Sequence, residues 1–340
     1  MGASGQAAVT PERIMQMAWG YAPALMIEAG VRNRVFDILD DGPQTVETMA
    51  VLSGASPRGV RALMNALAGF GLLIKSGDGQ FSLSTDAAAF LVSKKPGYLG
   101  GISRHAAEQM IPGWLHLSDV VRTGKPAEGV NRQKTGTEFF EKFVEDIFPM
   151  SYPSARALAA ALDVAGAHKP LRALDLAAGS GVWGIVLAES SPRVKVTAVD
   201  WPGVLEVTRK VVSRHGLTDR FEFVGGDLAQ ADFGSGYDVA TLGHILHSEG
   251  EKRGRALLRK TREALAPGGV VAIAEFLVDD ARAASPMSLM FAVNMLVFTD
   301  EGDTFSFNEI AAWLREAGFE NPRTIDAPGP SPLILANRPK

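Results

Sequence analysis

The run LRALDLAAGSGVWGIVLAE, which covers residues 171–189, constrains the fold more strongly than any other feature of this 340-residue sequence. An apolar stretch leads to Asp175, the glycine-rich residues 179–184 follow, and a second apolar stretch comes after them. A buried strand, a tight glycine turn and a helix in this order form the start of a β-α-β unit, with the helix N-terminus at the end of the strand. The run therefore predicts an α/β domain with a ligand site at the turn.

The rest of the C-terminal half alternates apolar runs with amphipathic segments. We expect strands at 194–200, 221–227, 237–246 and 270–278, with helices between them. This alternation is typical of a parallel sheet that is covered by helices on both faces. The last extended runs, at 321–328 and 331–339, are joined by two residues only, which forces an antiparallel pair. The sequence therefore predicts a Rossmann-like sheet with an antiparallel C-terminal hairpin.

The N-terminal part predicts an all-α and winged-helix architecture instead. Thr10-Pro11-Glu12 is typical of a helix start, and we expect one helix to continue to about Leu39. This helix is apolar over much of its circumference, as in helices that are buried against a partner chain. Two short helices on either side of Gly54, followed by two short strands around residues 77–79, form the pattern of a winged helix-turn-helix.

The charge of the winged helix argues against DNA binding. Residues 36–86 hold six acidic and three basic side chains, whereas each phosphate contact needs a cation. The net charge of the whole chain is −4, with an isoelectric point near 5.9. We therefore interpret this region as a packing and dimerisation module and expect no nucleic-acid partner, with a winged-helix regulator as the less favoured alternative.

The amino-acid composition limits which cellular compartments and which kinds of reactive site are expected. The chain has no Cys, which excludes disulfides, thiolate metal sites and a Cys nucleophile, and we expect no metal site. The N-terminus lacks a basic segment followed by an apolar one, so no signal peptide is predicted. No apolar run reaches the roughly 20 residues of a membrane span. We expect a cytoplasmic protein without a membrane partner.

These patterns divide the chain into three predicted parts. A winged-helix dimerisation domain is expected over residues 1–95, and a helical connector that contributes to a substrate pocket over 96–165. The α/β domain is expected over residues 166–340.

Acids at the strand ends indicate which ligand the glycine loop holds. Asp175 precedes the loop, where a negative charge would repel a pyrophosphate but suits a cationic group such as an ammonium. Asp200, at the end of the second strand, can accept from ribose hydroxyls, and Asp227, at the end of the third, can accept from an adenine amino group. NAD sites also have an acid at the position of Asp200. The combination of Asp175, Asp200 and Asp227 with the glycine loop, however, argues against NAD as the ligand.

Together, these acids, the glycine loop and the terminal hairpin resemble a class I S-adenosylmethionine-dependent methyltransferase. With the winged-helix domain and the connector, nearly the whole chain resembles the small-molecule O-methyltransferases of the caffeate/hydroxyindole type. The resemblance implies S-adenosyl-L-methionine as cofactor, methyl transfer to a hydroxyl of an aromatic or polycyclic small molecule, and a homodimer. Methylation of carbon or nitrogen, or a reaction without methyl transfer, stays open because a fold does not fix a reaction.

The resemblance also implies catalytic residues. The family commonly carries its catalytic His in the motif I-L-H-D-W, and the matching stretch, GHILHSEGEKRG, places it at His247. The family's next acid, in V-A-E, corresponds to Glu275 in VAIAEF. Its third acid, in G-G-x-E-R-T, falls at Thr304, with Asp303 beside it. An imidazole with a pKa near 6.5 can take the proton of a phenol, and a neighbouring acid can orient it.

Ser248 stands where the motif has Asp, and a structural explanation suffices for it. Residues 248–251, Ser-Glu-Gly-Glu, form the sequence pattern of a helix capping box, and residues 306–309 repeat that pattern. Neither serine is expected to be a nucleophile.

The expected ligand contacts follow from the same comparison. For the cofactor they are Asp175, Ala177, Gly179, Gly181, Asp200, Trp201, Asp227 and Leu228. The family usually has Gly at position 177 and a basic residue at position 243, where this chain has Ala and Gly. The Met-rich helix expected at 285–300 and the connector predict an adaptable acceptor wall. Its candidate residues are Met290, Asn294, Met295, Trp114 and Phe143.

Overall fold

The computed structural model describes residues 9–329 and 331–340 of the chain. These residues form two compact units, 1–111 and 112–340, which are described separately. The three-part division into 1–95, 96–165 and 166–340 stays a prediction.

The first unit begins with three helices, not with the single helix that the sequence predicts. They are α1 (Glu12–Ala18), α2 (Ala22–Arg32) and α3 (Val35–Asp40). Pro11, not Thr10, is the N-cap of α1. The expected continuous helix is wrong, because a turn at residues 19–21, which includes Gly20, separates the first two segments. Arg34, with φ +57°, turns the chain before the third.

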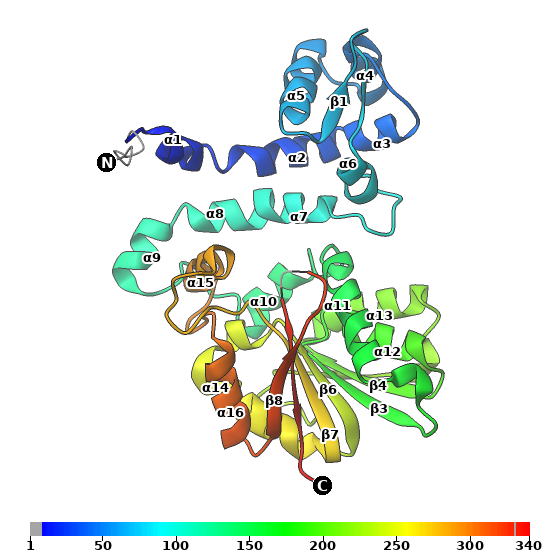
Figure 1. Cartoon of the computed structure of the whole chain (residues 1–340), viewed down its shortest axis with the longest axis vertical. Coiled ribbons are helices and arrows are strands. Elements are labelled where there is room, and N and C mark those ends of the chain that lie inside the picture. Colours follow the sequence, from blue (N-terminus) through cyan, green and yellow to red (C-terminus); the bar gives the residue numbers. More distant parts are fainter. Residues whose placement is uncertain (1–8, 330) are drawn as a thin grey trace, which may run out of the picture. The chain divides into compact units, whose positions relative to one another are not determined.

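A winged helix follows, as the sequence predicts. It comprises α4 (Val46–Ser53), α5 (Pro57–Gly69) and the antiparallel strands β1 (Leu73–Lys75) and β2 (Phe81–Leu83). The side chains of Thr45 and Ser56 cap the two helices. A core that includes Phe36, Met49 and Phe81 joins these elements. The unit continues through α6 (Thr85–Phe90), α7 (Gly100–His105) and a π-helical turn at Ala106–Met110 and ends at Ile111 (Figure 1). Ile111 is the first residue of α8 (Ile111–Trp114), the rest of which belongs to the second unit.

The second unit is built on a seven-stranded sheet in the order β5-β4-β3-β6-β7-β9-β8. Its strands are β3 (Leu171–Leu176), β4 (Val194–Asp200), β5 (Phe221–Gly225), β6 (Tyr237–Gly243), β7 (Leu265–Ala274), β8 (Glu320–Ile325) and β9 (Leu333–Asn337). The first five pair in parallel, and β9 pairs antiparallel with both β7 and β8. The predicted sheet and its C-terminal hairpin are confirmed.

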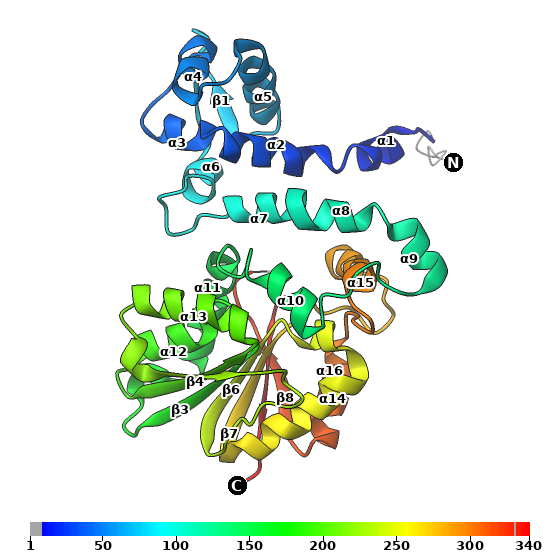
Figure 2. The ribbon, with the colours of Figure 1, turned by 180° about the vertical axis from the view of Figure 1, so that it is seen from behind.

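Helices cover both faces of this sheet (Figure 2). On one face a core joins the strands to α11 (Phe148–Ala161), α12 (Val182–Ser190) and α13 (Pro202–Arg214). On the other face a second core joins them to α14 (Leu246–Ala264) and α16 (Phe307–Glu316). The unit also contains α9 (Leu117–Thr123), α10 (Gln133–Phe140), a 3₁₀ turn at Val164–Gly166, α15 (Pro286–Phe298) and a 3₁₀ turn at Thr218–Arg220.

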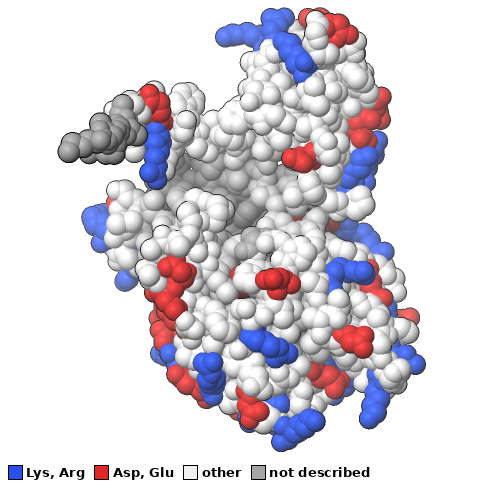
Figure 3. Space-filling model, in the orientation of Figure 1, with Lys and Arg blue, Asp and Glu red and all other residues white. Residues whose placement is uncertain are grey.

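The surface and the helix lengths complete this description. On the face drawn in Figure 3, Lys and Arg side chains of the second unit are interspersed with Asp and Glu, without a continuous positive area. Among the described residues, none of the helices has the length and apolarity to cross a membrane. The same residues include no group of three or more His, Asp or Glu side chains arranged to bind a metal ion.

The two predicted capping boxes have opposite outcomes. At Ser306, which precedes α16, the serine side chain accepts from the Glu309 N–H and the Glu309 side chain accepts from the Ser306 N–H, so this box is confirmed. The box at Ser248 is wrong, because α14 already begins at Leu246. The helix path is then interrupted at Gly250, whose φ of +71° is not helical.

We expect Ser306→Ala to lower the free energy of unfolding by about 1 kcal/mol. The variant loses the hydroxyl that accepts from the Glu309 N–H, and this breaks the reciprocal pair of hydrogen bonds at the start of α16. Urea denaturation measures this change. Ser213→Ala, at an exposed site within α13, is the matched control and should leave the midpoint nearly unchanged. Equal midpoints for both variants would contradict the expectation.

Candidate active site

The sequence-predicted site residues follow the carboxyl ends of five adjacent parallel strands. The glycine loop follows β3, Trp201 follows β4, Asp227 follows β5, His247 follows β6 and Glu275 follows β7. Carboxyl ends of parallel strands meet at one edge of a sheet, which is where open α/β sheets bind their ligands. The fold therefore gathers at one edge residues that lie up to 100 positions apart in the sequence.

The glycine loop turns through left-handed backbone conformations. Ala177, Gly179 and Gly181 have φ values of +52°, +55° and +79°. A Cβ atom on Gly181 would also lie 3.0 Å from the Thr208 methyl group. Glycine satisfies both requirements at 181, whereas Ala177 adopts a conformation that L-residues disfavour. This strain explains why the related family usually has Gly at that position.

Asp175 is a buried acid that holds the glycine loop and the sheet together. It is 1% exposed, and its carboxylate accepts from the Gly184 N–H at 3.0 Å and from the Thr241 hydroxyl at 2.8 Å. Burial raises the pKa of Asp175 to about 7, although these two hydrogen bonds lower it. Its bonds run to α12 and β6, so the carboxylate positions the loop from within the fold.

Asp200 holds the other end of the same loop. One carboxylate oxygen accepts from the Gly179 N–H at 2.9 Å and the other from the Trp201 N–H at 2.7 Å. Burial raises the pKa of Asp200 to about 6, although both hydrogen bonds favour the ionised form. The Trp201 ring packs on α10, where it contacts Phe140 and lies so close to Gly136 that a Cβ there would overlap it.

Asp227 and Leu228 lie in the loop after β5. Asp227 accepts from the Ala229 N–H at 2.8 Å and contacts the Arg253 guanidinium of α14. Leu228 is buried, and its carbonyl accepts from the Lys260 ammonium at 2.8 Å. Two basic side chains of α14 therefore fix this loop against the helix.

His247 and Glu275 form a buried pair. Nδ1 of His247 lies 2.7 Å from a Glu275 carboxylate oxygen, and the His247 backbone N–H donates to the other oxygen at 3.2 Å. Burial opposes ionisation of Glu275, but the imidazoles of His247 and His244 and the backbone N–H hold its pKa below the usual value. An ionised Glu275 accepts the proton of Nδ1, which leaves Nε2 as the basic nitrogen of the ring.

Aromatic packing fixes the orientation of this imidazole. The His247 ring lies edge-on to Phe291, with centroids 4.9 Å apart, and Phe291 lies 4.3 Å from the ring of Phe276. The sequence reasoning missed Phe276, although it follows Glu275 directly. Burial lowers the pKa of the neighbouring His244 to about 4, so His244 is neutral at pH 7. Its Nε2 lies 2.9 Å from the Ser331 hydroxyl.

The segment expected to carry a third acid lies against the backbone of His247. The Asp303 N–H donates to the His247 carbonyl at 2.9 Å, while the Asp303 carboxylate accepts from the Thr304 N–H at 2.7 Å. Thr304 is 1% exposed, and its hydroxyl has no hydrogen-bond partner within the part of the chain that the structure describes. Glu275 is thus the carboxylate that contacts the imidazole.

Gly243 explains the second departure from the family pattern. A Cβ at this position would overlap the indole of Trp183, which belongs to the first turn of α12. The basic residue that the family usually has here does not fit beside this indole. Trp183 and Gly243 therefore form a matched pair at the end of β6.

The candidate acceptor residues divide into a contacting pair and packed side chains. The Trp114 indole N–H donates to the Asn294 side-chain oxygen at 2.8 Å. Met295 and Phe143 are buried, whereas Met290, on the same helix as Asn294, is 49% exposed. The structure therefore brings Trp114 to α15.

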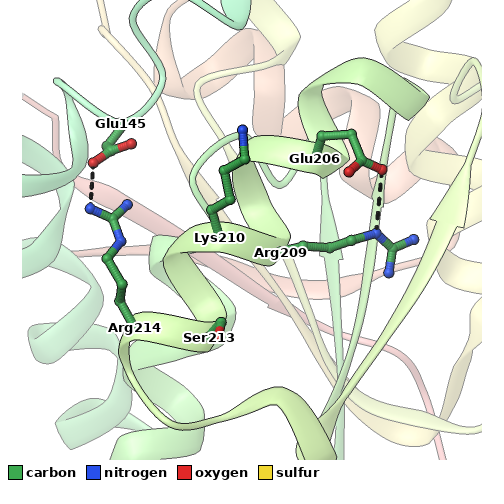
Figure 4. Close-up of a pocket in the computed structure, with 6 residues that line it drawn as sticks. All are labelled: Glu145, Glu206, Arg209, Lys210, Ser213 and Arg214. Atoms are coloured by element: carbon green, nitrogen blue, oxygen red, sulfur yellow. Dashed lines mark hydrogen bonds and ion pairs between the residues drawn. The ribbon is translucent and has the colours of Figure 1, made fainter.

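A separate cavity of about 610 Å³ lies along α13 and is lined by Glu145, Glu206, Arg209, Lys210, Ser213 and Arg214. In Figure 4, Arg214 points to Glu145 and Arg209 to Glu206, and both are ion pairs. This charged depression shares no residue with the site at the strand ends, so it does not bear on the chemistry there.

A Rossmann-like sheet that ends in an antiparallel hairpin, with this loop and these acids, defines a class I S-adenosylmethionine-dependent methyltransferase. The residues fit that cofactor: the glycine loop turns through left-handed conformations at the carboxyl end of β3, and two acids, Asp200 and Asp227, lie at or just after the ends of β4 and β5, the edge where open α/β sheets bind their ligands.

Comparison with known proteins identifies the family. Residues 114–320 match the model of the O-methyltransferase domain, and residues 15–93 match that of the O-methyltransferase dimerisation domain. The chain belongs to this O-methyltransferase family and is an S-adenosylmethionine-dependent O-methyltransferase.

Individual relatives span nearly the whole chain. The tetracenomycin polyketide synthesis 8-O-methyl transferase of Streptomyces glaucescens is 29% identical over 97% of this chain and 97% of its own. The 3-hydroxy-5-methyl-1-naphthoate 3-O-methyltransferase of Streptomyces sahachiroi is 31% identical over 93% of this chain and 91% of its own. The crystal structure of a putative O-methyltransferase from Nostoc punctiforme PCC 73102 matches with a TM-score of 0.89 and 27% identity, over 98% of this chain and all of that one.

We expect Ala177→Gly to raise the free energy of unfolding by about 1 kcal/mol, because glycine adopts the left-handed conformation without the Cβ penalty. Chemical denaturation checks the change. Ala178→Gly, at the buried neighbouring position, is the control and should destabilise, since it only removes a packed methyl group. Destabilisation by Ala177→Gly would contradict the strain assigned to position 177.

Proposed function

We propose that this enzyme transfers a methyl group to a hydroxyl of an aromatic or polycyclic small molecule, with His247 as general base and Glu275 as its partner. The observation that carries the proposal is the buried contact of 2.7 Å between Nδ1 of His247 and the Glu275 carboxylate. The naphthoate and polyketide named for the two Streptomyces relatives support an acceptor of this class.

The chemistry asks two things of the protein. A phenol has a pKa near 10, so a base must take its proton for the oxygen to attack at neutral pH. Nε2 of His247 takes that proton, and Glu275 stabilises the resulting imidazolium through Nδ1. S-adenosylmethionine, when bound, supplies the electrophilic methyl group. The acceptor oxygen must then be held about 3 Å from the methyl carbon and in line with the bond that breaks.

We infer two kinds of role for the cofactor residues. Ala177, Gly179 and Gly181 present the loop backbone to the ligand. The direct contacts come from Asp200, Trp201, Asp227 and Leu228. Asp175 is a positioning residue, because it is 1% exposed and both of its hydrogen bonds are internal, whereas Asp200 is only half-buried. This assignment revises the ligand-facing role that the sequence suggests for that carboxylate.

We infer that the acceptor lies against α15. Asn294 accepts from Trp114 through its oxygen, which leaves its amide N–H₂ to donate to an acceptor oxygen. Met290 provides an exposed, polarisable contact, while the buried Met295 and Phe143 shape the wall from behind.

We also propose that the enzyme is a homodimer. Its dimerisation-domain match begins at residue 15. None of the residues of α1 is buried, and Ile14, Met17 and Trp19 are 68%, 63% and 65% exposed. Several large apolar side chains exposed close together in the sequence are typical of a segment that packs on a partner.

His247→Ala should lower turnover by about 10²–10⁴-fold, the usual contribution of a general base. Its dissociation constant for S-adenosylhomocysteine should change little, because His247 is assigned to the acceptor. The experiment follows S-adenosylhomocysteine formation with a panel of hydroxynaphthoates and hydroxylated polycyclic aromatics. The methylated atom is located by NMR of the product.

The control for this experiment is His168→Ala, at an exposed histidine, which should retain full turnover. Unchanged turnover of His247→Ala would remove the base assignment. Binding of S-adenosylhomocysteine without methylation of any panel member would exclude the proposed acceptor class. A methyl group on carbon or nitrogen would exclude hydroxyl transfer.

Cofactor affinity should fall as the pH drops below about 6. Burial raises the pKa of Asp200 to about 6, and only the carboxylate form accepts from both ribose hydroxyls. Above the pKa the acceptor is present, and below it the affinity for S-adenosylhomocysteine should decrease about tenfold per pH unit. Titration calorimetry between pH 5 and 8 measures this. Asp200→Asn should bind more weakly and lose that slope; an unchanged slope would assign the titration to another group.

A further inference from the structure

Arg253 of α14 lies between two carboxylates, those of Glu249 and Asp227. The Arg253 Nε donates to Glu249 at 2.6 Å, and its Nη2 lies 3.3 Å from both oxygens of Asp227. Glu249 is 7% exposed and stands where the motif I-L-H-D-W has Trp. This Glu249–Arg253 pair occurs at the end of the site assigned to adenine.

The carboxylates that contact Arg253 are less exposed than those of an ordinary surface ion pair, although the Arg253 side chain itself is 39% exposed. Burial raises the pKa of Glu249, while Arg253 acts in the opposite direction. Removing a carboxylate from water costs free energy, which only a well-placed partner of opposite charge offsets. By contrast, Arg255 on the same helix pairs with Glu251 and Glu316, which are both more than half exposed.

The two carboxylates leave one nitrogen of the Arg253 guanidinium free to donate. A guanidinium has five N–H donors, and Glu249 and Asp227 engage Nε and Nη2. The remaining nitrogen, Nη1, makes no hydrogen bond within residues 9–329 and 331–340. Its two N–H groups belong to a guanidinium already in contact with the carboxylate assigned to the adenine amino group.

Adenine presents complementary chemistry to such a pair. Its amino group is a donor, and the ring nitrogens on either side, N1 and N7, are acceptors. A carboxylate that accepts from the amino group places a neighbouring guanidinium beside one of those nitrogens. The 3.3 Å contacts from Nη2 to Asp227 are long for charged partners, so the carboxylate can accept a further donor.

We propose that Arg253 is a cofactor-binding residue whose Nη1 donates to a ring nitrogen of adenine while Asp227 accepts from the amino group. Glu249 is its positioning residue, because it holds Nε in a fixed geometry. The proposal rests on the adenine role proposed for Asp227.

The test is titration calorimetry with S-adenosylhomocysteine and its 1-deaza and 7-deaza analogues, each of which lacks one of the two ring nitrogens. Wild-type enzyme should bind one analogue about 10- to 100-fold more weakly than S-adenosylhomocysteine, the loss of one hydrogen bond from a charged donor. Arg253→Ala should bind S-adenosylhomocysteine about 10- to 100-fold more weakly than the wild-type enzyme does. The variant should bind S-adenosylhomocysteine and the analogue that the wild type disfavours with equal affinity. Arg255→Ala is the matched control and should behave as wild type.

The outcomes separate this proposal from the proposed function. Failure of the wild-type enzyme to bind S-adenosylhomocysteine would overturn the cofactor site itself. Normal binding by wild type without discrimination against either analogue would overturn the role of Arg253 alone, even if Arg253→Ala did not fold. Equal losses for all three ligands in Arg253→Ala would also overturn it, because that pattern marks a structural effect on the whole site.

Discussion

Two acids, the buried Asp175 and the half-buried Asp200, hold the two ends of the glycine loop, and the rest of the site depends on this arrangement. Asp200, at the end of β4, accepts from the Gly179 N–H, and Asp175, at the end of β3, accepts from the Gly184 N–H. Each bond joins a strand end to the loop or to the first turn of α12. Burial raises the pKa of both acids, because it penalises the charged carboxylate. The hydrogen bonds from the loop act in the opposite direction and favour the carboxylate form.

The sheet was predictable because it depends on spacing, whereas the pair of His247 and Glu275 was predicted from the resemblance to the O-methyltransferase family. Alternating apolar runs define parallel strands, and a two-residue connection permits only an antiparallel return. His247 and Glu275 follow neighbouring strands, so the order of β6 and β7 in the sheet brings them together. Patterns with a fixed period survive in the fold because burial of one face enforces them.

Features that depend on side-chain direction were not predictable. Asp175 could face a ligand or the interior, and only packing shows that it faces Gly184 and Thr241. The N-terminal helix was expected to be continuous because its apolar pattern hides the break at Arg34. Phe276 and Trp183 were missed for a related reason: their contacts, with Phe291 and beside Gly243, join segments that are distant in the sequence.

The kink in α14 links His247 to the segment that lacks the third acid. Gly250 has φ +71°, and a Cβ there would overlap the Glu301 carbonyl. The glycine thus lets residues 301–303 reach the backbone of His247, where the Asp303 N–H donates to the His247 carbonyl. The same sequence that resembles a capping box is therefore a close-approach site. Since Thr304 is neutral, the carboxylate that contacts the imidazole is that of Glu275, on the Nδ1 side of the ring.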